Sequence, residues 1–398
     1  MKILTMSTLI AATLLAVQIP AFAEDDSMAA IRAELTRQRA LIAEQQAKMD
    51  ALADMLEKNA SSPAGEGATH VGFYGEVHYN YLNRPETLMS GDAEPTRSNF
   101  HAHRAVILLS HAFADNLHFY SEVEFEGAPD SSGIETELEQ LFIDWRLNRQ
   151  VSLNIGQFLL PVGLMNETHE PNVFYGVERN PVEEKIIPAT WWEKGVMVRT
   201  LPVEGLALDL AVHNGLHGDI ATLGGADGLR EFRQEFGGSR ADSMGYTLRA
   251  KYQVVPGLEI GAAVQRQDDI NNRLSSPEKA AATLWETHLN WQWRALTLKA
   301  LATEWKIDGA MAKANGTDRM TGMYLEPSWK LNEKLGLFAR YNQWNTAANQ
   351  PGRDDEKQVN AGVNYWITPQ VVLKADVQDT NRLDDAGDGF NLGVGLSF

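Results

Sequence analysis

The last ten residues, Gly389 to Phe398, read GFNLGVGLSF and limit the folds that the chain can adopt. Apolar residues occupy every second position of this stretch: Phe390, Leu392, Val394, Leu396 and Phe398. Because successive side chains of a strand point to opposite faces, the stretch predicts a strand with one apolar face and one small, polar face. Such a strand fits either the half-buried sheet of a soluble protein or the wall of a transmembrane barrel.

The same two-residue period recurs from residue 70 to the end of the chain and predicts 16 strands. In one stretch, for example, Trp285 and Trp291 lie on the face opposite Glu286. The first five expected strands span residues 70–82, 99–113, 117–127, 138–148 and 151–158. The others begin near residues 194, 206, 243, 258, 283, 296, 320, 335, 356, 370 and 389.

Short and long connections alternate strictly between these strands. Residues 114–116 and 149–150 are short links, whereas residues 84–98 and 159–193 are long ones. Soluble β-sandwiches mix connection lengths at both ends, but outer-membrane barrels have short periplasmic turns, long external loops and an even strand number. About 10 residues per strand also suit a tilted membrane crossing. We therefore predict an all-β fold, a 16-stranded antiparallel transmembrane β-barrel over residues 70–398.

The first 23 residues have the layout of a secretory signal peptide. Lys2 supplies a basic start, an apolar run follows from Leu9 to Ile19, and an A-x-A tripeptide ends at Ala23. The apolar run is too short for a membrane helix, which needs about 20 residues. We therefore expect residues 1–23 to be removed on export. The chain contains no Cys, which rules out a disulfide scaffold, a thiolate metal site and a cysteine nucleophile.

Residues 24–57 differ from the rest of the chain and predict a periplasmic coiled-coil arm. Apolar residues recur there with heptad spacing: Met28, Leu35, Ile42, Met49 and Leu56. This narrow seam suits a partner helix, although a single amphipathic helix packed on its own domain is the alternative. Residues 58–69 are rich in Gly, Ser, Pro and Ala and are expected to form a linker. An even strand number places both ends of the barrel, and so the arm, on the periplasmic side.

The composition argues against several classes of function. The formal net charge of −18 disfavours nucleic acid as a partner. No Ser lies in a G-x-S-x-G context, and we expect neither a catalytic residue nor a cofactor. His101 and His103 would share one face of a strand, but without further ligands they predict no metal site.

The segment from Gly156 to Gly195 reads GQFLLPVGLMNETHEPNVFYGVERNPVEEKIIPATWWEKG. Together with the arm, the strand number and the terminal aromatic residue, its opening resembles Gram-negative porins, in particular the phosphate-selective porin O and P family. The resemblance implies a homotrimer of 16-stranded barrels in outer-membrane lipid, each with a passive diffusion pore. In several members it also implies an anion-binding constriction lined by Arg and Lys. This segment holds more Glu than Arg and Lys, so phosphate selectivity does not carry over.

The link 159–193 is the longest connection, and we expect it to fold into the lumen and narrow the channel. An external cap packed on neighbouring loops is the alternative. Fixed charges in a pore set its ion preference, although cross-strand pairing is their other role. The charged residues expected at the constriction are Glu167, Glu170, Arg179, Glu183, Glu184, Lys185 and Lys194, together with Arg146, Arg199, Arg249, Lys251 and Arg340 of the barrel wall.

The sequence favours an outer-membrane porin of a Gram-negative bacterium. Its partners would be small hydrophilic solutes and ions, including anions such as phosphate, besides membrane lipid and two further copies of the chain. Two other functions stay open, a barrel that anchors a periplasmic coiled-coil tether and a barrel enzyme. Conductance in a planar bilayer separates a channel from a plugged anchor.

Overall fold

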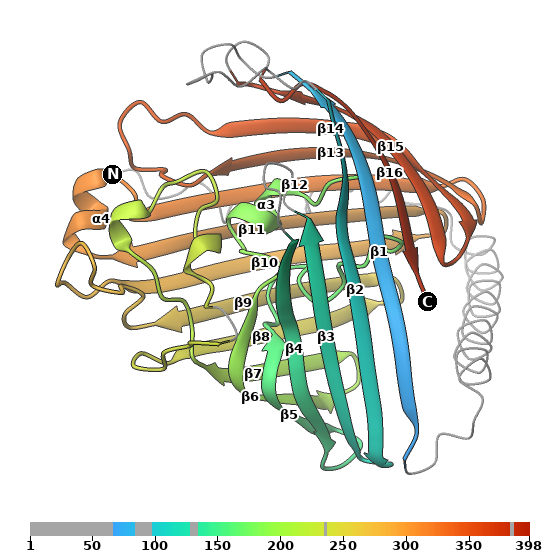
Figure 1. Cartoon of the computed structure of the whole chain (residues 1–398), viewed down its shortest axis with the longest axis horizontal. Helices are drawn as coiled ribbons and strands as arrows, with labels where there is room; N and C mark the ends of the chain where they lie inside the picture. The colour runs from blue at the N-terminus through green and yellow to red at the C-terminus, as the bar shows by residue number, and fades with distance from the viewer. Residues whose placement is uncertain (1–66, 84–97, 128–133, 235–236, 383–385) are drawn as a thin grey trace, which may run out of the picture. The chain divides into compact units, whose positions relative to one another are not determined.

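The computed structural model describes residues 67–83, 98–127, 134–234, 237–382 and 386–398. Within these residues, 16 strands form one closed barrel in which neighbours in sequence pair with each other (Figure 1). All of these pairs are antiparallel, so the predicted 16-stranded all-β barrel is confirmed. The expected signal peptide (1–23), the coiled-coil arm (24–57) and most of the linker (58–69) lie outside the described residues.

The strands are 8 to 17 residues long, which suits tilted crossings of a membrane. Their bounds are β1 Thr69–Leu82, β2 Ser98–Ala114, β3 Leu117–Gly127, β4 Ile134–Arg146, β5 Val151–Leu159, β6 Trp192–Val203, β7 Leu206–His213, β8 Gly245–Val255, β9 Leu258–Gln267, β10 Ala281–Trp293, β11 Leu296–Asp308, β12 Arg319–Lys330, β13 Leu335–Asn345, β14 Glu356–Thr368, β15 Val371–Thr380 and β16 Gly389–Ser397. Within the described parts of the long connections lie two short helices, α3 (Pro181–Lys185) and α4 (Ala310–Asn315), and two 3-10 turns, η2 (Ile220–Thr222) and η3 (Arg230–Phe232). Among the described residues, no helix combines the length and apolarity that a membrane crossing needs.

The two faces of the barrel wall differ as the alternation predicts. On β10, Trp285 points outward and is 55% exposed, whereas its neighbour Glu286 points inward and is 1% exposed. On β16, Leu392 is exposed and Asn391 is completely buried. An apolar outside and a polar inside are what a barrel in lipid with a wet lumen requires.

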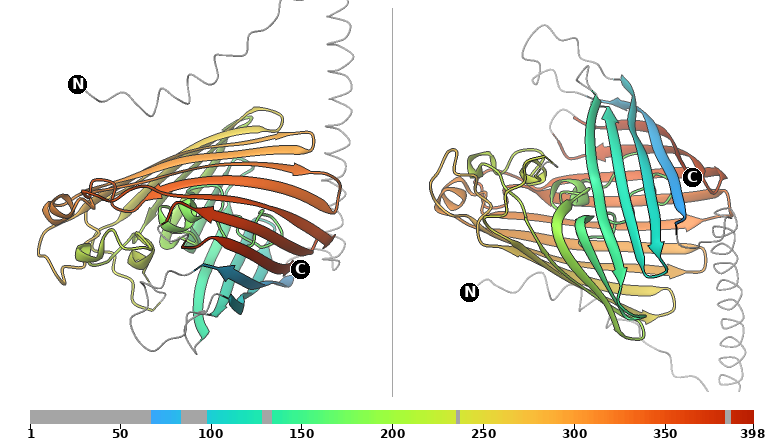
Figure 2. Two further views of the ribbon diagram at one scale, coloured as in Figure 1. Left: turned by 90° about the horizontal axis from the view of Figure 1, so that it is seen from above. Right: turned by 60° about the horizontal axis from the view of Figure 1, so that its bottom comes forward.

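The barrel closes at a seam between β1 and β16, which lie side by side in blue and red in Figure 2. Phe398 continues this pairing beyond the end of β16, because Phe73 and Phe398 exchange two backbone hydrogen bonds of 2.8 Å. Their rings stack with centroids 5.6 Å apart. Closure leaves no strand edge with unpaired backbone groups in lipid.

The fourth strand starts earlier than the sequence suggested. We expected a strand from residue 138, but β4 begins at Ile134. The extra residues include Glu135 and Glu137, which pair with Glu126 and Glu124 of β3. A stretch with several glutamates suggests a polar loop when only the sequence is considered. A strand that borders a water-filled lumen can nevertheless carry such residues on its inner face.

Two irregularities in the register place additional side chains inside the barrel. Between β1 and β2, Glu76 pairs with Arg104 and Val77 with Ala102, so His103 has no partner of its own. Between β3 and β4 the same kind of shift leaves Glu139 without a partner. A β-bulge of this type redirects a side chain, and strict alternation cannot predict it.

Candidate pore constriction

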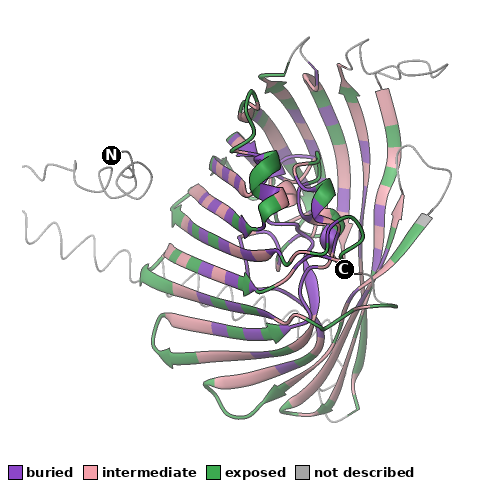
Figure 3. Cartoon of the chain, turned by 90° about the vertical axis from the view of Figure 1, so that its left-hand side faces the viewer, coloured by how far each residue is buried: buried purple, intermediate pink, exposed green. Residues whose placement is uncertain are grey.

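Residues 160–191, which include α3, join β5 to β6 and are called the lumen loop here, because they lie inside the ring of strands (Figure 1). Figure 3 shows that much of the chain inside the ring is buried. Side chains of the wall hold its backbone. Trp305 Nε1 on β11 donates to the carbonyl oxygen of Ile186 at 2.7 Å, and Arg104 Nη2 on β2 donates to that of His169 at 2.6 Å. Since β2 and β11 are almost diametrically opposite in the strand order, the loop crosses the lumen.

The same kind of contact continues on the third side of the barrel. The carbonyl oxygen of Phe174 accepts a 2.9 Å hydrogen bond from Asn364 Nδ2 on β14. The backbone N–H of Val177 donates to Asp376 Oδ2 on β15 at 2.7 Å. Buried backbone groups need partners, and the lumen loop finds them on side chains of the wall rather than within a sheet.

The lumen loop packs where the wall carries glycine. A Cβ atom at Gly322 on β12 would lie 2.7 Å from Val182 Cγ1 and 3.0 Å from Ile186 Cγ1, and one at Gly336 on β13 would collide with the Tyr175 hydroxyl. Real Cβ atoms essentially never lie within 3.0 Å of another atom, so a larger residue at either position would force the side chains of the loop to shift. Val182 and Ile186 are fully buried, and the burial of their side chains adds to the attachment of the loop.

Glu183 of α3 holds the inside of the lumen loop together. Its Oε1 accepts a 2.6 Å hydrogen bond from the Tyr324 hydroxyl on β12, and its Oε2 accepts the backbone N–H groups of Leu164 and Met165 at 2.9 and 2.7 Å. Burial raises the pKa of this carboxyl. Glu183 is only 1% exposed, so the expectation that it faces the pore is wrong: its hydrogen bonds draw it into the packed interior.

A cavity of about 490 Å³ adjoins the lumen loop on the side of the short turns. Arg199 Nε and Arg249 Nη2 contact Asp209 on β7 at 3.0 and 2.6 Å, and both arginines also contact Glu167 of the lumen loop. Basic groups outnumber acidic ones here: Arg146, Arg149, Arg199, Arg249 and Lys251 line the cavity with Glu167 and Asp209. The cavity is therefore basic overall, although Arg199 and Arg249 are already paired with carboxylates.

A second cavity, of about 70 Å³, lies on the side of the long loops. Its basic groups are Arg179 and Arg230, and Arg179 Nη1 donates to Thr190 Oγ1 at 2.8 Å. Six carboxylates line it: Glu124, Glu126, Glu137, Glu139, Glu178 and Glu184. The two sides of the lumen loop thus carry opposite charge. Acidic and basic groups are separated along the barrel axis, and not across the width of the pore.

The remaining charges expected on or beside the link are spread around it. Lys185 Nζ lies 3.5 Å from Asp227 Oδ1 in the connection between β7 and β8. Lys194 lies on β6 and contacts Ser239 in the same connection. Glu170 is half-buried, and its carbonyl oxygen accepts the N–H of Val173 at 3.2 Å.

Arg340 is buried beneath the lumen loop, so its expected place in the open pore lining is wrong. It is 3% exposed, donates to Glu326 Oε2 at 2.6 Å and also bonds the carbonyl oxygen of Tyr175 in the lumen loop. The loop covers it. Arg146 does face the cavity on the short-turn side, and it contacts Asp144 at 3.3 Å, the pairing that their shared face predicts.

Sequence reasoning missed the buried cluster around His169 of the lumen loop. Nε2 of His169 lies 2.9 Å from the Tyr74 hydroxyl, 3.4 Å from Glu139 Oε2 and 3.7 Å from Glu122 Oε1. Burial alone would lower the pKa of His169, but the two carboxylates outweigh it and raise the pKa to about 9. The bulge at Glu139 turns its carboxylate into the barrel, and the neighbouring sequence does not predict the bulge.

The long connection between β7 and β8 supports the lumen loop from the other side. Arg230 and Arg233 bond the carbonyl oxygens of Ala189 and Thr190. The Arg233 guanidinium also lies 4.4 Å from the ring centre of Trp192, a cation–π distance. The lumen loop is therefore held by a neighbouring loop as well as by the wall.

Comparisons with known proteins agree with this architecture. Residues 211–385 match the model of the family described as Gram-negative porin. An uncharacterized protein of Aquifex aeolicus (strain VF5) is 28% identical over 335 residues, which are 77% of this chain and 74% of that protein.

Solved outer-membrane proteins share the fold. The outer membrane channel DcaP of Acinetobacter baumannii has a TM-score of 0.58 at 11% identity, covering 85% of this chain and 99% of its own. OmpF of Salmonella typhi, in complex with daunomycin, has a TM-score of 0.53 at 13% identity, covering 83% and 97%. The trimer form of OmpT of Vibrio cholerae has a TM-score of 0.51 at 12% identity, covering 84% and 100%. These likenesses show a shared fold, the family match covers residues 211–385, and none of them reaches the narrower phosphate-selective family.

Proposed function

We propose that this protein is an outer-membrane porin whose channel is narrowed by the lumen loop and admits small hydrophilic solutes and ions by passive diffusion. The observation that carries the proposal is the loop itself, fixed to opposite walls of a closed barrel by Trp305 and Arg104. The porin family match and the similarity in fold to an outer membrane channel favour a channel over a barrel enzyme.

The charge pattern supports weak selectivity rather than a dedicated phosphate site. A solute that enters from the long-loop side meets glutamates first and the basic cavity afterwards. Arg199 and Arg249 of that cavity are already bound to Glu167 and Asp209, so an incoming anion has to compete with carboxylates. Rings of fixed charge that oppose each other along a channel reduce its net preference for either sign.

The assembly and the narrower family are also part of the proposal. A homotrimer is supported by the resemblance to porins and by the trimer form of a protein with the same fold. We further propose that residues 24–57 form the periplasmic coiled-coil arm that helps to hold three barrels together. Cross-linking of the full chain and of a chain without residues 24–57 tests the arm, since equal oligomers would exclude this role.

Planar-bilayer recording tests the proposed function directly. The purified full chain should show discrete openings, and a salt gradient should give a reversal potential that corresponds to a weak preference. Phosphate and neutral sugars serve as competing solutes. Absence of any conductance from correctly folded barrels would favour a plugged anchor, and hydrolytic activity of the same preparation would favour a barrel enzyme.

A further inference from the structure

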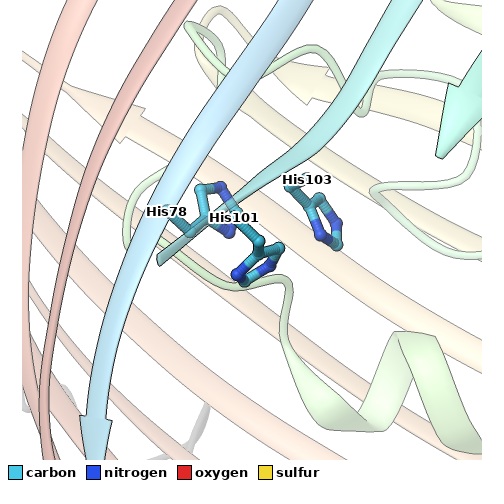
Figure 4. A group of neighbouring side chains, drawn as sticks. All are labelled: His78, His101 and His103. Carbon is cyan, nitrogen blue, oxygen red and sulfur yellow. The ribbon is translucent and has the colours of Figure 1, made fainter. Parts of the chain in front are cut away.

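Three histidines gather on the inner face of the wall, on the side of the long loops. His78 comes from β1, and His101 and His103 come from β2, and Figure 4 shows their rings beside one another. One ring nitrogen of each can be chosen so that all three lie within 4.8 Å of one another. The bulge in the β1–β2 ladder makes this possible, because His103 is the extra residue that it introduces.

Two of the imidazoles have a ring nitrogen without a hydrogen-bond partner among the described residues. These atoms, Nδ1 of His101 and Nδ1 of His103, are buried. The rings of His78 and His103 stack with centroids 4.7 Å apart, and His101 meets His103 edge-on at 5.5 Å. A buried polar atom without a hydrogen-bond partner destabilises the fold, so a ligand that binds these nitrogens would offset that cost.

The third histidine is oriented by carboxylates on both sides. His78 Nε2 lies 3.1 Å from Glu76 Oε2, and Glu76 in turn accepts a 2.6 Å hydrogen bond from Arg104. His78 Nδ1 lies 3.0 Å from Oε1 of Glu178 in the lumen loop. A carboxylate beside one ring nitrogen is the common outer-shell support of a metal-binding imidazole, and Glu76 takes that place beside His78.

We propose that His78, His101 and His103 bind a divalent transition-metal ion of the zinc type, with Glu178 as the fourth ligand. Imidazole nitrogen and a single carboxylate are a ligand set that suits such ions and not Ca²⁺ or Mg²⁺. In a tetrahedral shell with bonds of about 2.0–2.1 Å, neighbouring ligand atoms are about 3.3 Å apart, so the imidazoles and the Glu178 carboxylate would have to turn and move closer together when the ion binds. The proton shared by His78 Nδ1 and Glu178 leaves when the ion binds, as metal binding generally requires.

The bound ion would connect the lumen loop to the wall. Glu178 is the one ligand from the loop, and it also accepts a 2.8 Å hydrogen bond from Asn80 Nδ2 of β1. The ion would also add positive charge next to the acidic cavity, which His103 and Glu178 both line. The site does not depend on the proposed channel function, because its ligands are defined by the fold alone.

Zinc binding to the folded full chain, prepared without a histidine tag, tests the proposal. Isothermal titration with Zn²⁺ should give one ion per chain, and Co²⁺ should give the visible absorption of a four-coordinate site. The double variant His101→Ala/His103→Ala should weaken the affinity for Zn²⁺ at least 10-fold. His118→Ala, a strand histidine outside the cluster, serves as the matched control and should bind as the wild type does.

Folding of each variant is checked by heat-modifiable mobility on a gel. If the double variant does not fold, His101→Ala alone replaces it, since His101 is only half-buried, and the same loss of affinity is expected. The proposal is overturned if the wild type binds no Zn²⁺ below millimolar concentrations. Equal affinity in the His101 variant and in the His118 control would overturn it as well, because the ion would then lie elsewhere.

Discussion

The hydroxyl of Tyr324 on β12 donates a 2.6 Å hydrogen bond to Oε1 of Glu183, which precedes it by 141 residues. Both side chains are buried, and the second oxygen of Glu183 binds the backbone of Leu164 and Met165. One carboxylate therefore both folds the lumen loop on itself and fastens it to the wall. Several such contacts together, and not one alone, hold the loop inside the barrel.

Removing the hydroxyl should loosen the lumen loop without harming the barrel. Tyr324→Phe leaves a buried carboxylate oxygen short of a donor, which costs about 1–3 kcal/mol. We expect faster cleavage of residues 160–191 in limited proteolysis and unchanged heat-modifiable mobility. The control is Tyr341→Phe on β13, which removes a hydroxyl that donates an exposed hydrogen bond to Oε1 of Gln343. Identical cleavage of the two variants would exclude an anchoring role for Tyr324.

A larger side chain at Gly322 should displace the lumen loop. Its Cβ would lie 2.7 Å from Val182 Cγ1, and the rest of a valine would overlap with α3. We expect Gly322→Val to increase single-channel conductance and its fluctuation, because the loop can no longer rest on β12. Met323→Leu changes the outward-facing neighbour on the same strand and should leave conductance as it is. A wild-type conductance for Gly322→Val would contradict the packing described here.

The attachment of the lumen loop should weaken at alkaline pH. The carboxylates of Glu122 and Glu139 raise the pKa of His169 to about 9, against about 6.5 in an unfolded chain. Protonated His169 therefore contributes stability that is complete below about pH 6.5 and is lost as the pH rises through about 9, at most about 3 kcal/mol. Proteolysis of the loop should accelerate between pH 7 and about pH 9.5, and His169→Gln should remove that dependence. A pH dependence that persists in the variant would assign it to another group.

Loss of a cation on the loop should shift the ion preference. Arg179 lies among glutamates, and Lys185 is close to Asp227, so Arg179→Ala and Lys185→Ala should each move the reversal potential toward cation selectivity by a few-fold at low salt. The shift should fade as salt increases, since the screening length is about 10 Å at 0.1 M. Lys313→Ala on α4, an exposed residue, is the control. Saturating phosphate conductance that either loop substitution abolishes would instead indicate a dedicated anion site.

The barrel could be predicted from the sequence because its signal is periodic. Residues such as Trp285 and Glu286 must alternate for a wall between lipid and water, and the alternation of short and long links adds an independent constraint. The longest link could also be singled out, since a long loop without regular structure is usually functional. The even strand number also allows the first and last strands to pair antiparallel, as β1 and β16 do.

The site was harder to predict for two physical reasons. The bulges at His103 and Glu139 break the alternation by one residue, and nothing in the neighbouring sequence marks them. Charge alone also does not say whether a residue faces water or a partner. Glu183 and Arg340 look like pore charges in the sequence, but Glu183 is buried within the lumen loop, where it binds Tyr324 of the wall, and Arg340 is buried beneath the loop, where it binds Glu326 and Tyr175.

The single-channel conductance of a barrel without its lumen loop tests most directly whether this loop sets the width of the channel. Leu160 N donates to the Trp191 carbonyl oxygen at 2.9 Å, so the ends of the loop are already paired as a hairpin and a short Asn-Gly turn can replace residues 161–190. Heat-modifiable mobility confirms that the shortened chain forms a barrel. We expect a conductance several-fold above that of the wild type in the same salt, because the loop no longer fills the lumen. An unchanged or lower conductance from folded barrels would show that the lumen loop does not set the width of the channel.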